Sequence, residues 1–206
     1  PAVSETELRE VSQLSLSRVL RIVWLLGSAA VLTWFAAANL LFALRLRKTR
    51  IPFPAEGASL PVYVTSAAVS PCLFGLFHPA VYLTPKAAER PECLRHVVTH
   101  ELCHYRHGDH VWSLLRGLCL SIYWFNPLVW LAASLSRADA ELACDEAVLR
   151  TLGPVCKKAY ALTLLDMAQR RPAPAPLCSA FARSRAEERI RAILQYRRVP
   201  AWAGME

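Results

Sequence analysis

The sequence lacks the cysteine and methionine patterns of several familiar protein classes. It has no Cys-x-x-Cys pair, and its seven cysteines are scattered along the chain. An odd number of scattered cysteines indicates reduced thiols facing a cytosol rather than a disulfide framework, and no spacing among them suits a cysteine-based zinc site. Methionine occurs only as Met167 and Met205, and neither position suggests the Met-turn of a metzincin peptidase.

Acidic residues are also fewer than basic residues. The 206 residues include 16 Asp and Glu against 24 Lys and Arg, a formal net charge of +8, while 54% are hydrophobic and the mean hydropathy is +0.26. A basic balance is typical of proteins that meet nucleic acid or an anionic membrane, and the hydrophobic content favours the membrane. Because the chain starts at Pro1 rather than methionine, we expect it to be a piece of a longer protein.

A long apolar run predicts a transmembrane helix over residues 19–44, preceded by a polar helix within 1–18. Residues 22–44 carry no charge, and 23 residues at 1.5 Å each can cross a hydrocarbon layer of about 30 Å. The polar leader is too long for a signal peptide; a buried core helix is the alternative. Four basic residues follow the run, namely Arg45, Arg47, Lys48 and Arg50. The positive-inside rule therefore predicts a cell-membrane protein whose chain from residue 45 onward lies in the cytoplasm.

A small β-sheet is predicted between residues 51 and 85. Proline and glycine mark a linker and then separate four short runs rich in β-branched and aromatic residues, at 62–65, 67–69, 73–77 and 80–83. We expect two to four strands. The edge that contains Leu73, Phe74 and Gly75 is expected to bind a substrate backbone as an added strand. The alternative is a sheet that only supports the next helix.

The sequence His-Glu-Leu-Cys-His at 100–104 lies in a predicted helix over 91–107. Residues four apart lie on one helix face, so His100 and His104 can bind one metal ion, with Glu101 beside them as the catalytic base. Two histidines, a carboxylate base and an open metal position are typical of zinc peptidases, and we therefore expect one Zn²⁺. The alternative is a polar helix face with two solvated histidines.

A catalytic zinc usually has a third protein ligand, and three residues are candidates. His110 matches the last position of the metzincin pattern, but that pattern requires glycine where this chain has His107. His96 lies on the same face as His100, but ligands at i, i+4 and i+8 extend over about 12 Å, too far for one zinc. Glu141 is the best candidate.

Glu141 lies in a helix predicted over 127–152, with Asp145 one turn later. Asp145 is expected to accept the free N–H of a metal-binding histidine. An acidic helix face without a metal is the alternative. The apolar stretch 111–134 separates His104 from Glu141, and a single crossing of the bilayer would place them on opposite sides. We therefore predict a helical hairpin that dips into the membrane and returns, broken by Asn-Pro within 124–127.

Taken together, these residues resemble the BlaR/MecR-type membrane zinc metallopeptidases, the signal-transducing proteases of bacterial β-lactam resistance. The match covers about residues 60–195. Its segments are His-Glu-Leu-Cys-His with Asp109 following, Trp-Phe-Asn-Pro-Leu-Val-Trp at 124–130, Glu-Leu-Ala-Cys-Asp-Glu at 141–146, Phe-Gly at 74–75, Ser-Ala-Phe at 179–181 and Glu-Arg-Ile at 188–190. The resemblance implies zinc ligands at His100, His104 and Glu141, a base at Glu101 and a gluzincin-like fold on the cytoplasmic face.

The expected fold is α+β and mainly helical, with the peptidase domain over 51–171 and Asp109 supporting the end of the metal helix. Residues 172–206 are expected to hold a proline linker and a basic amphipathic helix, 184–196, that packs against the domain and does not bind nucleic acid. The expected activity is cleavage of a protein, either the chain itself or a transcriptional repressor. The alternatives are a housekeeping membrane protease and a non-catalytic scaffold whose zinc is closed by Cys103 or Cys144. The oligomeric state is not predicted.

Overall fold

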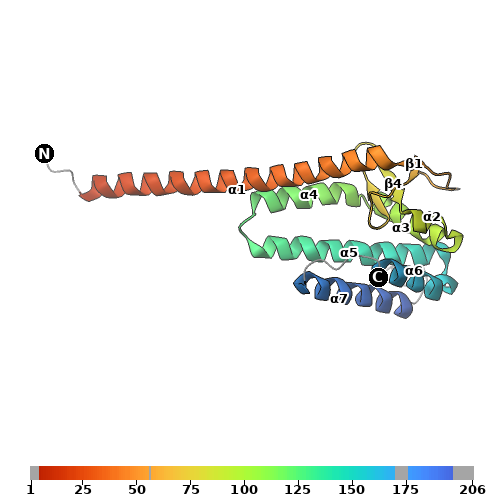
Figure 1. The fold of residues 1–206 in the computed structure, drawn as a ribbon. Coiled ribbons are helices and arrows are strands. Elements are labelled where there is room, and N and C mark those ends of the chain that lie inside the picture. The colour runs from red at the N-terminus through yellow and green to blue at the C-terminus, as the bar shows by residue number, and fades with distance from the viewer. Residues whose placement is uncertain (1–4, 56, 170–175, 197–206) are drawn as a thin grey trace.

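The computed structural model describes residues 5–55, 57–169 and 176–196. Helix α1 (Glu5–Thr49) is its longest element and extends well beyond the other helices (Figure 1). The polar leader and the apolar run form one uninterrupted helix, because no proline separates them. The segment Ser15–Thr49 is long and apolar enough to cross a membrane, and none of its most apolar window is buried inside the molecule. It is the one such helix among the residues that the structure describes.

The predicted sheet has four strands and lies at the basic end of α1 (Figure 1). The strands are β1 (Ile51–Pro52), β2 (Val62–Val64), β3 (Cys72–Phe74) and β4 (Ala80–Leu83). Their order is β1-β2-β4-β3, with β2 parallel to β4 and the other pairs antiparallel. Strand β3 is therefore an edge strand, as predicted.

Two details of the predicted strands were wrong. The run 67–69 is not a strand, because Ser66, Ser70 and Pro71 bracket it and leave Val69 exposed. Conversely, the linker contains β1, whose Pro52 is tolerated because β1 lies at the sheet edge.

The sheet packs against α1 on one side and against the helix that contains His-Glu-Leu-Cys-His on the other. Leu46 of α1 is fully buried in a cluster with Ala68, Ala80 and Tyr82, and the Thr49 hydroxyl lies 2.5 Å from that of Thr65. Helix α2 (Pro85–Ala88) precedes helix α3 (Pro91–Arg106), which begins and ends within one residue of the prediction. The apolar face of α3 packs on β2 and β4 through the cluster Val62, Val81, Leu83, Val97, Val98 and Leu102.

Helices α4 (Asp109–Ile122) and α5 (Pro127–Leu152) run in opposite directions, with α4 alongside α1 (Figure 1). The chain turns at 123–126, where the Asn126 side chain accepts the Leu128 N–H at 3.0 Å and so caps α5. This turn contacts α1, because the Trp24 indole N–H donates to the carbonyl of Ile122 at 2.9 Å. The placement of this helix pair in a bilayer stays a prediction.

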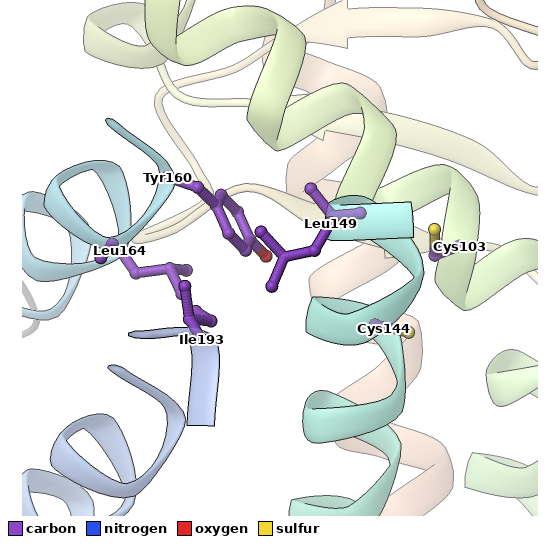
Figure 2. Packing of buried hydrophobic residues seen from close by; sticks show 8 residues of the cluster. Cys103, Cys144, Leu149, Tyr160, Leu164 and Ile193 are labelled. Carbon is purple, nitrogen blue, oxygen red and sulfur yellow. The ribbon is translucent and has the colours of Figure 1, made fainter. Parts of the chain in front are cut away.

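The second half of α5 packs against the C-terminal helices. These are a short 3-10 turn at Pro154–Cys156, α6 (Lys157–Gln169) and α7 (Pro176–Gln195). Figure 2 shows Tyr160 reaching from α6 toward Leu149 of α5, with Leu164 and Ile193 beside it. Helix α7 begins earlier than predicted and packs on the domain through Ile193, which is 1% exposed. Of the predicted proline linker, Pro172 and Pro174 lie outside the described part, as do the residues after 196, whereas Pro176 is the first residue of α7, so the linker prediction was wrong there.

Candidate metal centre

Three of the predicted site residues converge between α3 and α5. The Nε2 atoms of His100 and His104 lie 3.1 Å apart, because a four-residue spacing places both imidazoles on one face of α3. From α5, Glu141 brings its Oε2 atom to 3.5 Å from His100 Nε2. One ligand atom from each of the three residues lies within 4.8 Å of the other two. The structure therefore brings together the three proposed ligands.

The other nitrogen of each imidazole has a partner of its own. His104 Nδ1 lies 2.6 Å from a carboxylate oxygen of Asp109. His100 Nδ1 lies 2.9 Å from the hydroxyl of Tyr160, and that hydroxyl donates to Asp145 Oδ1 at 2.6 Å. Since an ionised carboxylate only accepts, and the Tyr160 proton points to Asp145, these partners assign the proton of each neutral imidazole to Nδ1.

This assignment leaves both Nε2 atoms as lone-pair acceptors that face each other and the Glu141 carboxylate. Three acceptors without a shared proton repel one another unless a cation lies between them. Two imidazoles and one carboxylate are also a donor set that catalytic zinc sites use. The residues therefore fit a divalent metal ion.

Asp109 and Asp145 support the two histidines in different ways. Asp109 contacts His104 directly, as a carboxylate behind a metal-binding histidine does. Asp145 was predicted to accept a histidine N–H, but its Oδ1 lies 3.4 Å from His100 Nδ1 and the Tyr160 hydroxyl bridges the two. Tyr160 is fully buried, and its position could not be read from the residues around the histidines.

A second residue that the sequence did not reveal is Arg189 of α7. Its Nε and Nη2 atoms donate to the two oxygens of Asp145 at 2.7 and 2.8 Å, and its Nη1 atom lies 2.8 Å from Glu141 Oε2. The sequence contained only a weak indication of this role. Arg189 lies next to Ile190, on the helix that was expected to pack against the domain.

The charges of the centre stabilise one another. Burial alone would raise the pKa of Glu141, but the contact with His100 and the Arg189 guanidinium hold that pKa below its ordinary value. Burial would lower the pKa of His100, yet Glu141, Glu101 and Asp145 raise it, so when no cation lies between the ligands a proton on His100 Nε2, toward Glu141, is favoured in its place. Burial and the Asp145 charge raise the pKa of Tyr160, so its hydroxyl stays protonated and remains a donor.

Glu101 is buried, 6% exposed, and lies on α3, which packs against strand β3. Burial and the negative charge of Glu101 raise the pKa of the Cys72 thiol in β3 to about 12. The side chains of the predicted substrate edge have structural roles. Leu73 packs in the sheet core and Phe74 meets Phe42 of α1 edge to face, at 5.1 Å between ring centroids. A peptide that binds along this edge would therefore contact the backbone of β3.

The rejected ligand candidates lie elsewhere. His96 Nδ1 lies 3.2 Å from the Thr163 hydroxyl, and the His110 ring stacks on Tyr105. In the described part of the chain, neither belongs to a group of side chains able to hold a metal. A second such group, His104 with Asp109 and Cys144, places the Cys144 sulfur 3.2 Å from His104 Nδ1. That nitrogen is on the opposite edge of the ring from the one facing His100, so Cys144 does not face the same metal position.

A family model described as BlaR1 peptidase M56 matches residues 2–193. The chain belongs to this family. M56 proteins are metallopeptidases, so membership implies a peptidase that uses a metal ion. The resemblance predicted from the motifs is confirmed.

Two relatives show the same similarity over shorter stretches. Over 88 residues the M56 chain is 38% identical to the regulatory protein BlaR1 of Bacillus licheniformis. Over 85 residues it is 28% identical to the methicillin resistance mecR1 protein of Staphylococcus aureus (strain Mu50). Each match covers 40% of this chain and 14% of the relative, so the similarity reaches only a small part of either relative's length.

Proposed function

We propose that this chain is the zinc-dependent endopeptidase part of a membrane-anchored signalling protein, with its active site facing the cytoplasm. The observation that carries the proposal is the convergence of the His100 and His104 Nε2 atoms with Glu141, beside the buried Glu101. A His-Glu-x-x-His helix with a glutamate ligand from a second helix is the gluzincin arrangement that the sequence predicted.

Each residue of the centre has a separable task. When bound, zinc would polarise the scissile carbonyl and lower the pKa of a bound water. Glu101 would accept the proton of the attacking water and donate it to the leaving amine. Asp109 holds the His104 ring, and the Tyr160 hydroxyl with Asp145 holds the His100 ring. These contacts fix the orientation of both imidazoles before substrate arrives.

The free edge of β3 supports an extended peptide as substrate. An edge strand offers unpaired backbone N–H and C=O groups, to which a peptide adds as a further strand. Residues Leu73, Phe74 and Gly75 would carry this contact, because β3 pairs with β4 on its other side. Its neighbour Glu101 would then lie close to the scissile bond.

The surface of the helices supports the membrane assignment. Along α1, α4 and the start of α5 many large apolar side chains are exposed, among them Leu25, Trp34, Leu114, Leu118, Leu128 and Leu131. The turn between α4 and α5 contacts α1 at Trp24, near the start of its uncharged stretch. The three helices would thus share one hydrocarbon layer, with the hairpin entering and returning. The basic residues 45–50 adjoin the sheet, which favours the cytoplasmic side for the centre.

The names of the relatives suggest the pathway. One is called a regulatory protein and the other a methicillin resistance protein. We propose accordingly that the substrate is a protein of a β-lactam-type response, either a transcriptional repressor or the chain itself, and that the chain does not bind nucleic acid directly. A scaffold with a closed structural zinc is disfavoured, because Cys144 lies behind His104 and Cys103 lies in the hydrophobic core.

The test is a zinc count and a cleavage assay on the full chain in detergent. We expect one zinc per wild-type chain by elemental analysis, and metal-dependent cleavage of an unfolded protein such as denatured casein. Glu101→Gln is expected to keep the zinc and abolish cleavage, whereas Glu141→Ala is expected to lose both. His110→Ala is the matched control and should retain both. A well-folded wild type without zinc, or zinc lost only in His110→Ala, would contradict the proposal.

A further inference from the structure

We infer that Arg189 is a positioning residue of the metal centre, and that the centre is complete only while α7 is docked. The inference rests on the proposed function, because it assigns the carboxylates that Arg189 contacts to a zinc peptidase. Its basis is a three-point contact between one guanidinium and two carboxylates.

The contact has the geometry of a specific, largely buried ion pair. Three nitrogens of Arg189 each lie within 2.8 Å of a carboxylate oxygen, two on Asp145 and one on Glu141. The side chains of Arg189 and Asp145 are 18% and 3% exposed, so this is not a solvated surface pair. The planar fork of arginine provides donors in these directions at once, whereas a lysine ammonium is a single point charge.

Through these contacts Arg189 reaches both sides of the centre. On one side it holds the carboxylate of the proposed ligand Glu141 directly. On the other it holds Asp145, which accepts the Tyr160 hydroxyl, and that hydroxyl in turn meets Nδ1 of His100. One guanidinium therefore orients the third ligand and fixes the ring of the first. In the described part of the chain its hydrogen bonds and ion pairs go to these two carboxylates, and it acts on the centre through them, which makes it a positioning residue rather than a catalytic one.

The guanidinium comes from a separate part of the chain. His100, His104 and Glu141 lie on α3 and α5, whereas Arg189 lies on α7, more than 40 residues after Glu141. Helix α7 is held by Ile193 and Ile190 in the cluster around Tyr160. An event that displaces α7 would remove the positive charge that holds Glu141. Docking of α7 and competence of the centre are thereby linked.

The same contact permits an opposite role. Because Arg189 Nη1 lies on Glu141 Oε2, the guanidinium could compete with the metal for that oxygen. The two roles predict opposite signs. A positioning residue strengthens metal binding and turnover, whereas a competitor weakens both.

The experiment compares Arg189→Ala, Arg189→Lys and the matched control Arg191→Ala, in which an exposed arginine of the same helix is removed. Zinc affinity is measured by competition with a chromogenic chelator, and kcat and KM are measured on the substrate that wild type cleaves. We expect Arg189→Ala to bind zinc about 10- to 100-fold more weakly, the usual effect of removing a group that orients metal ligands. We expect kcat to fall with KM little changed, and Arg191→Ala to match wild type.

Two further readouts separate positioning from a general loss of structure. Millimolar methylguanidinium should restore part of the kcat of Arg189→Ala and leave Arg191→Ala unchanged. Removing Arg189 leaves the buried Asp145 without its cation, so this variant is at risk of unfolding. In that case Arg189→Lys decides, because it retains a positive charge. Zinc affinity reduced about tenfold or more in folded Arg189→Lys supports the inference.

The inference would be overturned if folded Arg189→Ala showed zinc affinity and kcat at or above the wild-type values. It would also be overturned if Arg189→Ala did not fold and Arg189→Lys showed wild-type zinc affinity and kcat. Either result would leave the proposed function intact. A wild-type chain that binds no zinc would overturn both together.

Discussion

The carboxylate of Asp109 lies 2.6 Å from Nδ1 of His104, and this contact joins the metal helix to the helix that follows it. Asp109 is the first residue of α4, which packs along α1. The orientation of a proposed metal ligand therefore depends on where α4 begins, and α4 in turn depends on α1. A displacement of α1 would reach the metal centre through this path.

Replacement of Asp109 by asparagine tests the first step of that path. Asparagine has nearly the same shape, but it lacks the negative charge that holds the proton on His104 Nδ1. We expect zinc affinity to fall about 10- to 100-fold, measured by competition with a chelator. Asp139→Asn, at an exposed position of α5, is the control and should leave the affinity unchanged. Equal affinities in Asp109→Asn and wild type would show that the Asp109 contact does not support the metal.

Gly27 provides a test of the contact between α1 and the turn of the helix pair. A Cβ atom at Gly27 would overlap the indole ring of Trp124, whereas one at Gly117 of α4 would meet nothing within 4 Å. Alanine normally stabilises a helix relative to glycine by about 0.5–1 kcal/mol. We therefore expect Gly117→Ala to raise the Tm in detergent, and Gly27→Ala to lower it through overpacking of roughly 1–3 kcal/mol. A rise in both variants would mean that Trp124 is not docked on α1.

Much of the metal helix could be predicted because its information is local. The spacing of His100 and His104 specifies one helix face, and Glu141 and Asp145 show the same spacing on a second helix. Of the three candidate third ligands in the sequence, Glu141 was the best, and the structure brings it together with His100 and His104.

The contacts that surround these residues depend on tertiary packing and could not be predicted in the same way. Tyr160 reaches Asp145 because side chains of α6 and α5 share one hydrophobic cluster, and Arg189 reaches Glu141 because α7 packs against both helices. Neither side chain has a distinctive neighbour in the sequence. The strand β1 escaped prediction for another reason, since Pro52 suggests a linker unless the strand is known to lie at an edge.

Cys72 tests the position of Glu101 without any assay of cleavage. Burial and the Glu101 carboxylate raise the pKa of the Cys72 thiol to about 12, so at pH 8 only roughly 0.01% of it is the reactive thiolate. We expect slow alkylation by iodoacetamide, with a rate that rises as the pH approaches 12. Glu101→Gln removes the negative charge, which lowers the pKa of Cys72 and should accelerate its alkylation severalfold at pH 8.

The alkylation rate is measured for each cysteine by mass spectrometry of the digested chain, with Cys93 as the internal control. Cys93 lies two turns before Glu101 on α3 and should react at the same rate in both chains. An unchanged rate at Cys72 would place Glu101 away from β3, and the proposed approach of substrate along that strand would lose its support.

Tyr160→Phe isolates the bridge between His100 and Asp145. The phenyl ring retains the packing of Tyr160 in the core, but His100 Nδ1 loses its partner and Asp145 loses one donor. Removing one partner from a buried hydrogen bond costs about 1–3 kcal/mol, so we expect a lower Tm. Zinc should also dissociate faster, because the His100 ring is free to rotate or to change tautomer. Tyr105→Phe, on an exposed side chain of α3, is the control. If zinc dissociates from Tyr160→Phe at the wild-type rate while the Tm falls, the hydroxyl stabilises the fold without orienting His100, and Asp145 then acts on the centre only through Arg189.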